Sequence, residues 1–305
     1  MSICVIFNPS ARGEKAKKFR AYLEESRGDW ELKPTTGPGG ARKLATEAVQ
    51  QGFRTIVAAG GDGTLNEVVN GLADAPNGLA SARLGVLPLG TINVFARELR
   101  LPLDIKKVCS LLNNADDSEL LLDLGCAEFQ SNGGTQRRYF AQLAGAGFDA
   151  RSVELVNWEI KKKVGPAAYV MAGLQALGGN QPQITIRGGG QEHTGELILI
   201  GNGKFYGGSF PLFHKSDLQD GVLDVVVFPK VNWQTLPGHV LNFLRGKLFR
   251  EGGSIYMHST EFCLSANAHA ALQLEGELVG ELPAKISIVP RALRVVAPRA
   301  TKPGL

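Results

Sequence analysis

The chain of 305 residues has only four cysteines, and none of its apolar runs approaches the length of a membrane span. A spanning helix needs about 20 apolar residues, so the sequence predicts no transmembrane helix. The cysteines are far apart and form no pair with metal-ligand spacing, which predicts reduced, mostly buried thiols. The chain starts directly in a strand-like segment without a signal-peptide pattern, which predicts a cytoplasmic location. No basic array with interleaved aromatic residues indicates a nucleic-acid partner.

Composition indicates a globular protein, with 44% hydrophobic and 20% charged residues. The length suffices for two packed cores. Two common nucleotide-binding signatures are absent: the Lys-Ser/Thr ending of a P-loop and the wider spacing of the Rossmann fingerprint. A nucleotide site in this chain must therefore be of another kind.

A glycine-rich run joins an apolar strand pattern, Val57–Ala59, to a helical pattern that starts at Asn66. Its residues are Gly60-Gly61-Asp62-Gly63-Thr64. Glycines let backbone N–H groups approach an anion, and the following helix directs its positive end to the same point. The alternative is an ordinary strand–turn–helix corner. Asp62 favours chemistry, because a carboxylate beside phosphates must meet a metal ion, a hydroxyl or a ribose. We expect it on an exposed loop.

Further segments make the chain similar to the diacylglycerol kinase and sphingosine kinase family. They run in order through nearly the whole sequence: Ile3–Gly13, Leu84–Arg97, Leu143–Ala150, Gly201-Asn202, Tyr206–Gly208, Asp220–Asp224 and Leu274–Glu277. The resemblance implies a lipid kinase that uses ATP and Mg²⁺.

The first part of the chain alternates short apolar runs with helical patterns. Strands are expected at 3–7, 56–59 and 84–87, and helices at 14–23, 41–50, 66–72 and 94–99. This alternation predicts an α/β domain over residues 1–122 with a mostly parallel sheet and flanking helices. The resemblance implies that this domain is similar to that of NAD kinase. The proposed nucleotide segments each follow an apolar run, so they lie at the carboxyl edge of that sheet.

From about residue 123 the pattern changes to short β-rich runs with turn residues, which predicts a mainly antiparallel β-sandwich over 123–290. Expected strands include 139–143, 183–187, 196–200, 222–228, 286–289 and 293–296, and helical patterns lie at 166–177 and 233–244. In similar proteins the last segment, here 291–305, returns to the first domain.

The resemblance implies which residues contact ATP: Asn8, Pro9, Ser10, Ala11, Arg12, Thr35, Gly61, Asp62, Gly63, Thr64, Leu65, Asn66, Glu67 and Thr91. The hydroxyls of Ser10 and Thr91 could equally cap helices. Basic residues near the first helix either attract phosphate or are simply solvated. They are Arg12, Lys15, Lys17, Lys18 and Arg20.

Transfer of a phosphoryl group to an alcohol needs a divalent cation and an acceptor for the hydroxyl proton. By resemblance, Glu277 is that acceptor and Glu275 assists at the metal or the hydroxyl, with Asp62 the third catalytic residue. Relatives usually have aspartate where this chain has Glu275. On residue type alone, the two glutamates flanking a glycine would indicate a turn between strands.

Two other positions concern the metal. Val94 stands where many relatives have an aspartate, and any role of that aspartate is lost or transferred, with Asp62 and Asp123 as candidates. The segment from Asp217 to Val222 is similar to a second cation site of bacterial members, in which Asp220 supplies its carboxylate and Asp217 and Val222 supply carbonyl oxygens. A plain Asp-Gly turn before a strand is the alternative.

The sequence does not choose among diacylglycerol, sphingoid bases and other lipid alcohols. Net charge of +4 mildly favours an anionic membrane surface. The mixed apolar and basic stretches 241–250 and 158–163 indicate peripheral contact with the inner face of the membrane, unless they pack on the sandwich. A homodimer is compatible with the sequence. NAD kinase, a non-catalytic nucleotide-binding regulator and, more distantly, a Rossmann enzyme are the alternatives to a lipid kinase.

Overall fold

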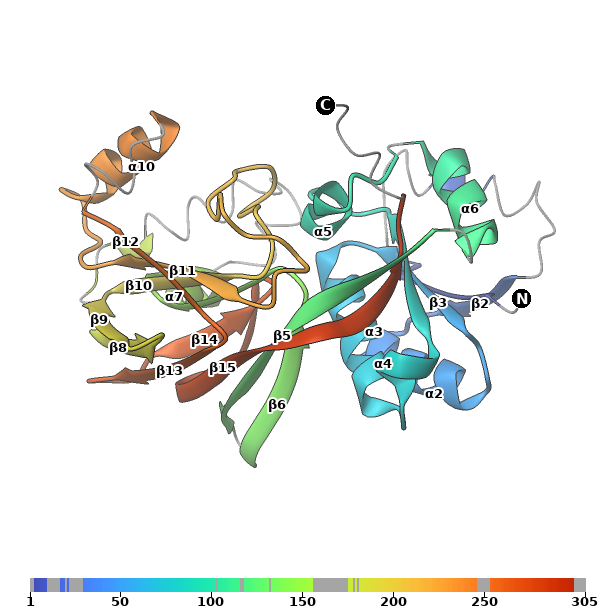
Figure 1. The fold of residues 1–305 in the computed structure, drawn as a ribbon, viewed down its shortest axis with the longest axis horizontal. Helices are drawn as coiled ribbons and strands as arrows, with labels where there is room; N and C mark the ends of the chain where they lie inside the picture. The colour runs from blue at the N-terminus through green and yellow to red at the C-terminus, as the bar shows by residue number, and fades with distance from the viewer. Residues whose placement is uncertain are drawn as a thin grey trace. The chain divides into compact units, whose positions relative to one another are not determined.

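The computed structural model describes residues 3–9, 17–19, 21, 30–102, 104–115, 118–131, 133–155, 175–177, 179, 181–245 and 253–298. The described chain forms two compact units (Figure 1). The first contains the residues up to Leu124, Phe205–Phe210 and those from Val289 onward, and the second contains Gly125–Lys204 and Pro211–Ile288. Two strands, β5 (Glu119–Ser131) and β15 (Glu277–Val296), supply residues to both units.

The first unit is built on a parallel sheet with the strand order β4-β3-β1-β2, and the end of β15 pairs in parallel with β4. The strands are β1 (Ile3–Phe7), β2 (Trp30–Pro34), β3 (Thr55–Gly60) and β4 (Arg83–Pro88). Every residue of β3 and β4 is buried, as expected for strands covered on both faces. The predicted α/β fold with a mostly parallel sheet is confirmed.

Helices cover both faces of this sheet. Figure 1 shows α6 on one side of the strands and α2, α3 and α4 on the other. Their bounds are α2 (Gly40–Gln50), α3 (Asp62–Asp74), α4 (Gly78–Ser81), α5 (Val94–Glu98) and α6 (Ile105–Asn113). Most of the helix predicted at 14–23 lies outside the described residues. The described residues Lys17–Phe19 are helical.

One expectation at the glycine-rich run was wrong. Helix α3 starts at Asp62, four residues before the predicted start at Asn66, so the run is mostly the first turn of a helix. The Leu65 N–H already donates to the Gly61 carbonyl, 3.1 Å away, which closes that turn. Gly63 does not prevent the helix from starting at Asp62. A glycine in a helix lowers its stability by only about 1 kcal/mol, and the packing of the helix contributes more than that.

The second unit is the predicted, mainly antiparallel β-sandwich. One sheet has the order β12-β11-β10-β7-β14, and β9, β8 and β13 continue onto β15 in the other layer. Its elements are β6 (Gly134–Phe140), β7 (Leu143–Gly147), α7 (Phe148–Glu154), β8 (Ile184–Gly188), β9 (Gln191–Gly195), β10 (Leu197–Gly201), β11 (Leu223–Phe228), α10 (Leu236–Leu244), β12 (Ile255–Ser259), β13 (Glu261–Ala266) and β14 (Ala271–Leu274).

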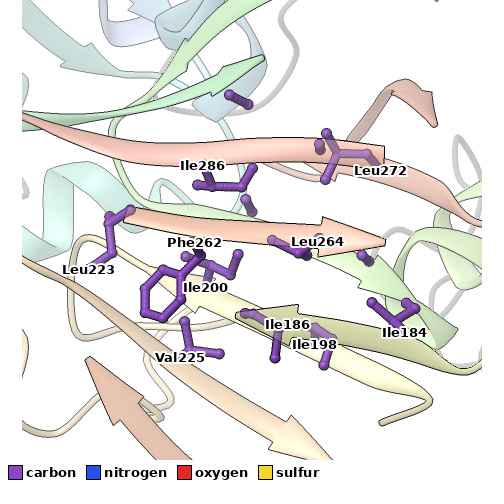
Figure 2. Packing of buried hydrophobic residues seen from close by; sticks show 14 of the residues in the cluster. Ile184, Ile186, Ile198, Ile200, Leu223, Val225, Phe262, Leu264, Leu272 and Ile286 are labelled. Carbon is purple, nitrogen blue, oxygen red and sulfur yellow. The ribbon is translucent and has the colours of Figure 1, made fainter. Parts of the chain in front are cut away.

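Aliphatic and aromatic side chains from the two layers form the core of this unit. Figure 2 shows Ile184 and Ile186 of β8 and Phe262 and Leu264 of β13 among Ile198 and Ile200 of β10 and Leu223 and Val225 of β11. Alternate residues of each strand point inward, which is the period-2 pattern of a strand with one buried face.

Three details differ from or complete the expectations. The strand predicted at 139–143 is interrupted at Ala141 and Gln142, and the strands predicted at 286–289 and 293–296 are both parts of β15.

Three cysteines are buried and Cys263 is exposed, and all four thiols are free. Among the described residues, no helix has both the length and the apolar character needed to cross a membrane.

Candidate functional site

The strands of the first unit bring three predicted nucleotide segments to one edge of the sheet. Phe7 of β1 lies beside Ala59 of β3, and Gly60 lies beside Pro88 of β4. The chain beyond β1 stays at this edge, since the Asn8 N–H donates to the Ala59 carbonyl at 3.4 Å. Thr35 follows β2, and its N–H donates to the Phe7 carbonyl at 2.9 Å.

Two glycine backbones touch at this edge. The Gly90 N–H donates to the Gly60 carbonyl at 3.1 Å. A Cβ atom on Gly90 would lie 2.5 Å from the Gly61 Cα, a distance that side chains do not tolerate. The loop after β4 can therefore lie against the loop after β3 only because residue 90 has no side chain, and both loops leave their backbone accessible to a ligand.

Helix α3 starts at this contact and leaves its first N–H groups without an intrahelical acceptor. They belong to Asp62, Gly63 and Thr64, and together with the helix dipole they favour an anion such as phosphate. Leu65 and Asn66, which the resemblance implied as ATP contacts, are buried with 4% and 8% exposure. Their side chains pack inside the unit, so the first turn offers backbone groups rather than these side chains.

Asp62 joins the starts of two helices and is half-buried, which corrects the expected exposed loop. Its carboxylate lies by the first N–H groups of α5, and the Phe95 N–H is 3.4 Å from Oδ1. Burial raises the pKa of Asp62, and the nearby N–H groups of Val94, Phe95 and Asn93 offset part of that rise. A carboxylate in this position also faces any phosphate bound at α3.

Val94, at the position where the resemblance led us to expect an aspartate, has a buried side chain and directs its backbone N–H to Asp62. Asp123, one candidate to replace that aspartate, is buried, and its Oδ1 accepts the Arg291 N–H at 2.7 Å. Asp62 thus lies near this position, whereas Asp123 fixes β15.

Asn93 is a residue that the sequence analysis missed. It adopts a left-handed backbone conformation with φ of 53° and is 6% exposed. Its Nδ2 donates to the Gly90 carbonyl at 2.6 Å, and within the described part of the chain its buried Oδ1 has no hydrogen-bond partner. The signal was the αL preference of asparagine, three residues after a glycine in the loop that follows β4. Asn93 shapes the loop that lies on Gly61.

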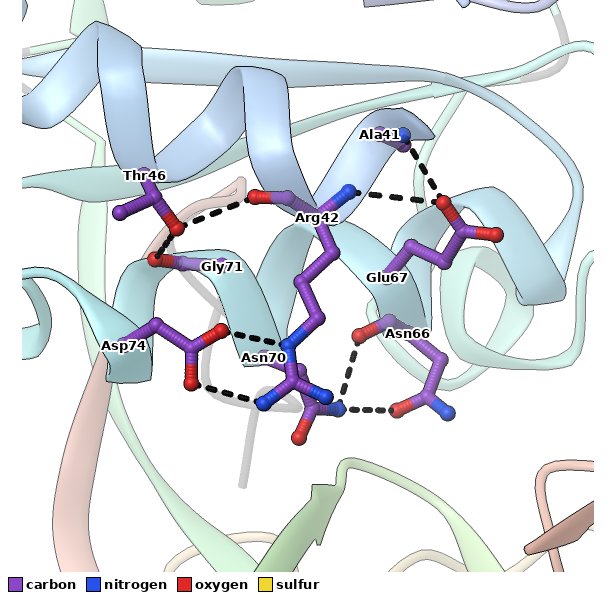
Figure 3. Close-up of polar contacts among 8 residues, drawn as sticks. All are labelled: Ala41, Arg42, Thr46, Asn66, Glu67, Asn70, Gly71 and Asp74. Carbon is purple, nitrogen blue, oxygen red and sulfur yellow. Dashed lines mark hydrogen bonds and ion pairs between the residues drawn. The ribbon is translucent and has the colours of Figure 1, made fainter. Parts of the chain in front are cut away.

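Glu67, an implied ATP contact, binds the start of helix α2. Its carboxylate accepts the Gly39 N–H at 2.9 Å. It also accepts the N–H groups of Ala41 at 2.9 Å and Arg42 at 3.4 Å (Figure 3). Three backbone donors thus converge on one carboxylate, which supplies the cap that α2 lacks in its own sequence. The motif residue therefore has a structural task in this chain.

Further polar contacts hold α3 against α2. Arg42 Nη2 donates to Asp74 Oδ1 at 2.7 Å, and Thr46 Oγ1 donates to the Gly71 carbonyl at 2.9 Å (Figure 3). A Cβ on Gly71 would lie 2.3 Å from the Arg42 carbonyl oxygen, so the two helices are in close contact. Helix α3, which begins at this edge of the sheet, is therefore held firmly against α2.

The segment Phe205–Phe210 also belongs to the first unit. The Phe205 N–H donates to Glu98 Oε2 at 3.3 Å, and a Cβ on Gly208 would lie 3.5 Å from Ile92 Cγ2. The predicted segments around Gly90 and Gly208 are thus neighbours. Thr91 between them is exposed. Ser10, Ala11 and Arg12, like Lys15 and Arg20, lie outside the described residues, and Pro9 is exposed.

Glu275 and Glu277 lie in the second unit, at the hairpin between β14 and β15. Leu274 pairs with Glu277, and the two residues between them have positive φ of 53° and 79°. This is the geometry of a two-residue type I′ turn, as expected from residue type alone. Glu277 is exposed at the start of β15. Glu275 Oε1 accepts the N–H groups of Ala141 and Gln142, both at 2.7 Å.

The predicted cation segment lies before β11. Asp220 accepts the N–H groups of Asp217 and Val222, both at 3.1 Å. Burial raises the pKa of Asp220, and the negative charges of Asp224 and Asp217 raise it further. No cluster of three or more His, Cys, Asp or Glu side chains with metal-binding geometry occurs among the described residues.

We predict that Gly90→Ala breaks the close contact between the backbones of Gly90 and Gly61. The added Cβ meets backbone rather than a mobile side chain, so the loops must separate. We expect a loss of about 1–3 kcal/mol of stability and at least a ten-fold loss of ATP affinity, measured by thermal unfolding and calorimetry. Gly37→Ala is the matched control, because a Cβ there meets nothing within 4 Å. Wild-type ATP affinity in Gly90→Ala would contradict the assignment.

Comparisons with known proteins agree with this geometry. The model of the "Diacylglycerol kinase catalytic domain" matches residues 2–123, and that of the "YegS C-terminal NAD kinase beta sandwich-like domain" matches residues 142–297. A diacylglycerol kinase of Bacillus subtilis is 33% identical over 97% of this chain and 96% of its own length. One of Staphylococcus carnosus is 29% identical, with 98% and 95% coverage.

A solved structure has the same fold. The crystal structure of a diacylglycerol kinase from Bacillus anthracis aligns with a TM-score of 0.73 and 23% identity, and the alignment covers 98% of this chain and 97% of that chain. The sequence relatives and the two domain matches together show that the chain belongs to the diacylglycerol kinase family of lipid kinases.

Proposed function

We propose that the protein transfers the γ-phosphoryl group of ATP to the hydroxyl of a lipid alcohol, diacylglycerol or a related lipid such as a sphingoid base. The observation that carries this proposal is the contact of Gly61 with Gly90 under the start of α3, with Asp62 beside it. It provides an anion site next to a carboxylate, in a chain whose family phosphorylates lipids.

ATP binds at the carboxyl edge of the parallel sheet. Backbone N–H groups of the first turn of α3 hold its phosphates, and Asn8, Thr35 and Thr91 line the same edge. The Asp62 carboxylate lies between the bound phosphates and the start of α5, and it orients the phosphate groups there. Leu65, Asn66 and Glu67 support the site from within, since their side chains are buried or bound to α2.

Mg²⁺ is the cation we propose, and the acidic segment before β11 fits it. Two backbone donors hold the Asp220 carboxylate, and Asp217 and Asp224 concentrate negative charge around it. The Asp220 carboxylate and the carbonyls of Asp217 and Val222 would hold the ion, with oxygen ligands as a hard cation prefers. We propose a structural or regulatory role for this second ion, and the Mg²⁺ that accompanies ATP would screen negative charge on the reacting phosphates.

Glu277 is the proposed proton acceptor. The lipid oxygen attacks the γ-phosphorus, its O–H proton moves to the Glu277 carboxylate, and the bond from phosphorus to the ADP oxygen breaks. Glu277 is exposed at the start of β15, where a lipid hydroxyl can reach its carboxylate. The product is a phosphorylated lipid, which would connect the enzyme to phospholipid biosynthesis.

The test is label transfer from γ-³²P-ATP with Mg²⁺ to purified dioleoylglycerol or sphingosine in detergent micelles, followed by chromatography. We expect a labelled lipid with wild type and none with Asp62→Ala. NADP formation from NAD would instead show an NAD kinase. ATP binding without transfer to any acceptor would show a nucleotide-binding regulator.

In the same assay, Glu277→Gln is expected to lower turnover about a hundred-fold or more with unchanged ATP affinity. The amide keeps the shape but takes no proton. Glu281→Gln, on the same strand, is the matched control. A variant with normal turnover, or with equally weakened ATP binding, would remove the proton-acceptor role.

We also propose that one face of α10 contacts the membrane. It consists of Pro237 and Leu241 of α10, Trp233 in the turn before the helix and Arg245 at its C-cap. All four are exposed, Trp233 to 57% and Leu241 to 45%. We call it the α10 stripe. Figure 1 shows α10 at one end of the second unit, beyond β12. The helix is anchored elsewhere, since His239 packs edge-on against Phe228 at 5.1 Å between ring centroids.

Charge complements this apolar stripe. Residues 225–250 of the sequence contain four basic residues and no acidic one. Of these, Lys230 and Arg245 are exposed in the described part of α10 and its flank. Apolar side chains bordered by basic ones suit the headgroup region of an anionic bilayer, where Trp is favoured. The predicted stretch 241–250 is partly described, and 158–163 lies outside the described residues.

Replacing Trp233 and Leu241 together by serine is expected to weaken binding to phosphatidylglycerol vesicles about ten-fold or more, measured by sedimentation without ATP. Leu32→Ser, which removes an equally exposed leucine from the first unit, is the control. Unchanged vesicle binding, or equal binding to neutral phosphatidylcholine in high salt, would contradict the membrane role of the stripe.

A further inference from the structure

The Glu275 carboxylate binds a break in the strand opposite its turn. Ala141 and Gln142 separate β6 from β7, so their N–H groups lack strand partners of the regular kind. Glu275 Oε1 accepts both N–H groups at 2.7 Å. The Glu275 N–H donates in the same region, to the Leu143 carbonyl at 3.0 Å. Residue 275 is therefore held through both its side chain and its backbone.

Asn202 binds the carbonyl groups of the same two residues. Its Nδ2 donates to the Ala141 carbonyl and its N–H donates to the Gln142 carbonyl, both at 2.8 Å. Asn202 is 1% exposed. The N–H and C=O groups of both break residues are thus bound by Glu275 and Asn202, as the interior of a protein requires.

Gln273 holds the second residue of the turn. Its Oε1 accepts the Gly276 N–H at 2.7 Å, and its Nε2 donates to Asp149 Oδ2 at 2.6 Å. Gly145 lies beside Gln273 in the neighbouring strand, and a Cβ there would lie 2.2 Å from Asp149 Oδ2. The missing side chain at residue 145 leaves the space in which Asp149 meets Gln273.

We infer that Glu275 is a positioning residue rather than a catalytic one. Its carboxylate and the Asp149–Gln273 pair fix the two turn residues that precede Glu277, and so fix where the Glu277 carboxylate begins. Glu275 also keeps a left-handed backbone, which is unfavourable for a residue with a Cβ. The two bonds to the strand break offset that cost. The inference deepens the proposed function and rests on Glu277 as proton acceptor.

Glutamine separates the two roles. An amide oxygen still accepts both N–H groups, but an amide neither takes a proton nor replaces a carboxylate at a metal ion. Positioning therefore predicts that Glu275→Gln keeps turnover within about ten-fold of wild type, since bonds to a neutral acceptor are roughly half as strong. Glu275→Ala, which removes the acceptor, is expected to lose turnover about a hundred-fold.

The experiment measures kcat, the KM for ATP and amide exchange for the full chain. In Glu275→Ala we expect kcat to fall with an unchanged KM for ATP, and the Ala141 and Gln142 amides to exchange at least ten-fold faster. In Glu275→Gln both amides stay protected. Gly145→Ala is expected to lower kcat in the same way through Asp149 and Gln273. Glu192→Ala, at an exposed glutamate of β9, is the control.

A hundred-fold loss in Glu275→Gln with protected amides would overturn the inference and show a catalytic carboxylate. Unchanged amide exchange in Glu275→Ala would also overturn it. If Glu275→Ala does not fold, Glu275→Gln alone decides, because it preserves both bonds. Failure of the proposed function is distinguishable, because Glu277→Gln would then keep full turnover while the amide exchange at Ala141 still responded to residue 275.

Discussion

The contact between the Gly61 and Gly90 backbones is the constraint on which the proposed nucleotide site depends. With a side chain at residue 90, the loop after β4 could not lie against the loop after β3. The contact brings the start of α3 next to the start of α5, and Asp62 connects the two. Contacts between α2 and α3 then keep the helix in place, so the proposed phosphate site would need little rearrangement to bind its ligand.

In the second unit, side chains rather than touching glycines bring together segments that are distant in sequence. A strand break leaves four backbone groups to satisfy, and Glu275 and Asn202 satisfy them. Segments around residues 143, 202 and 275, which are far apart in sequence, meet for this reason. A motif that resembles paired catalytic acids thus combines one acid that holds the backbone with one, Glu277, that is exposed at the start of β15.

The α/β unit, its parallel sheet and the sandwich were predictable because buried strands and helices carry strong hydrophobic periodicity. The edge that gathers Asn8, Gly60 and Gly90 was predictable too, because each follows an apolar run. The tasks of Glu67 and Glu275 were not, since each depends on N–H groups distant in sequence. The start of α3 was misplaced because glycines suggested a loop where tertiary packing favours a helix.

The most direct test of the account is amide hydrogen exchange with and without ATP and Mg²⁺. If phosphates bind at the glycine contact, ATP should slow exchange in the peptides that cover residues 60–66 and 90–93, and leave the β8–β9 hairpin unchanged. Slowing only in other segments, or none at residues 60–66 at saturating ATP, would contradict the central claim that this edge of the sheet holds the nucleotide.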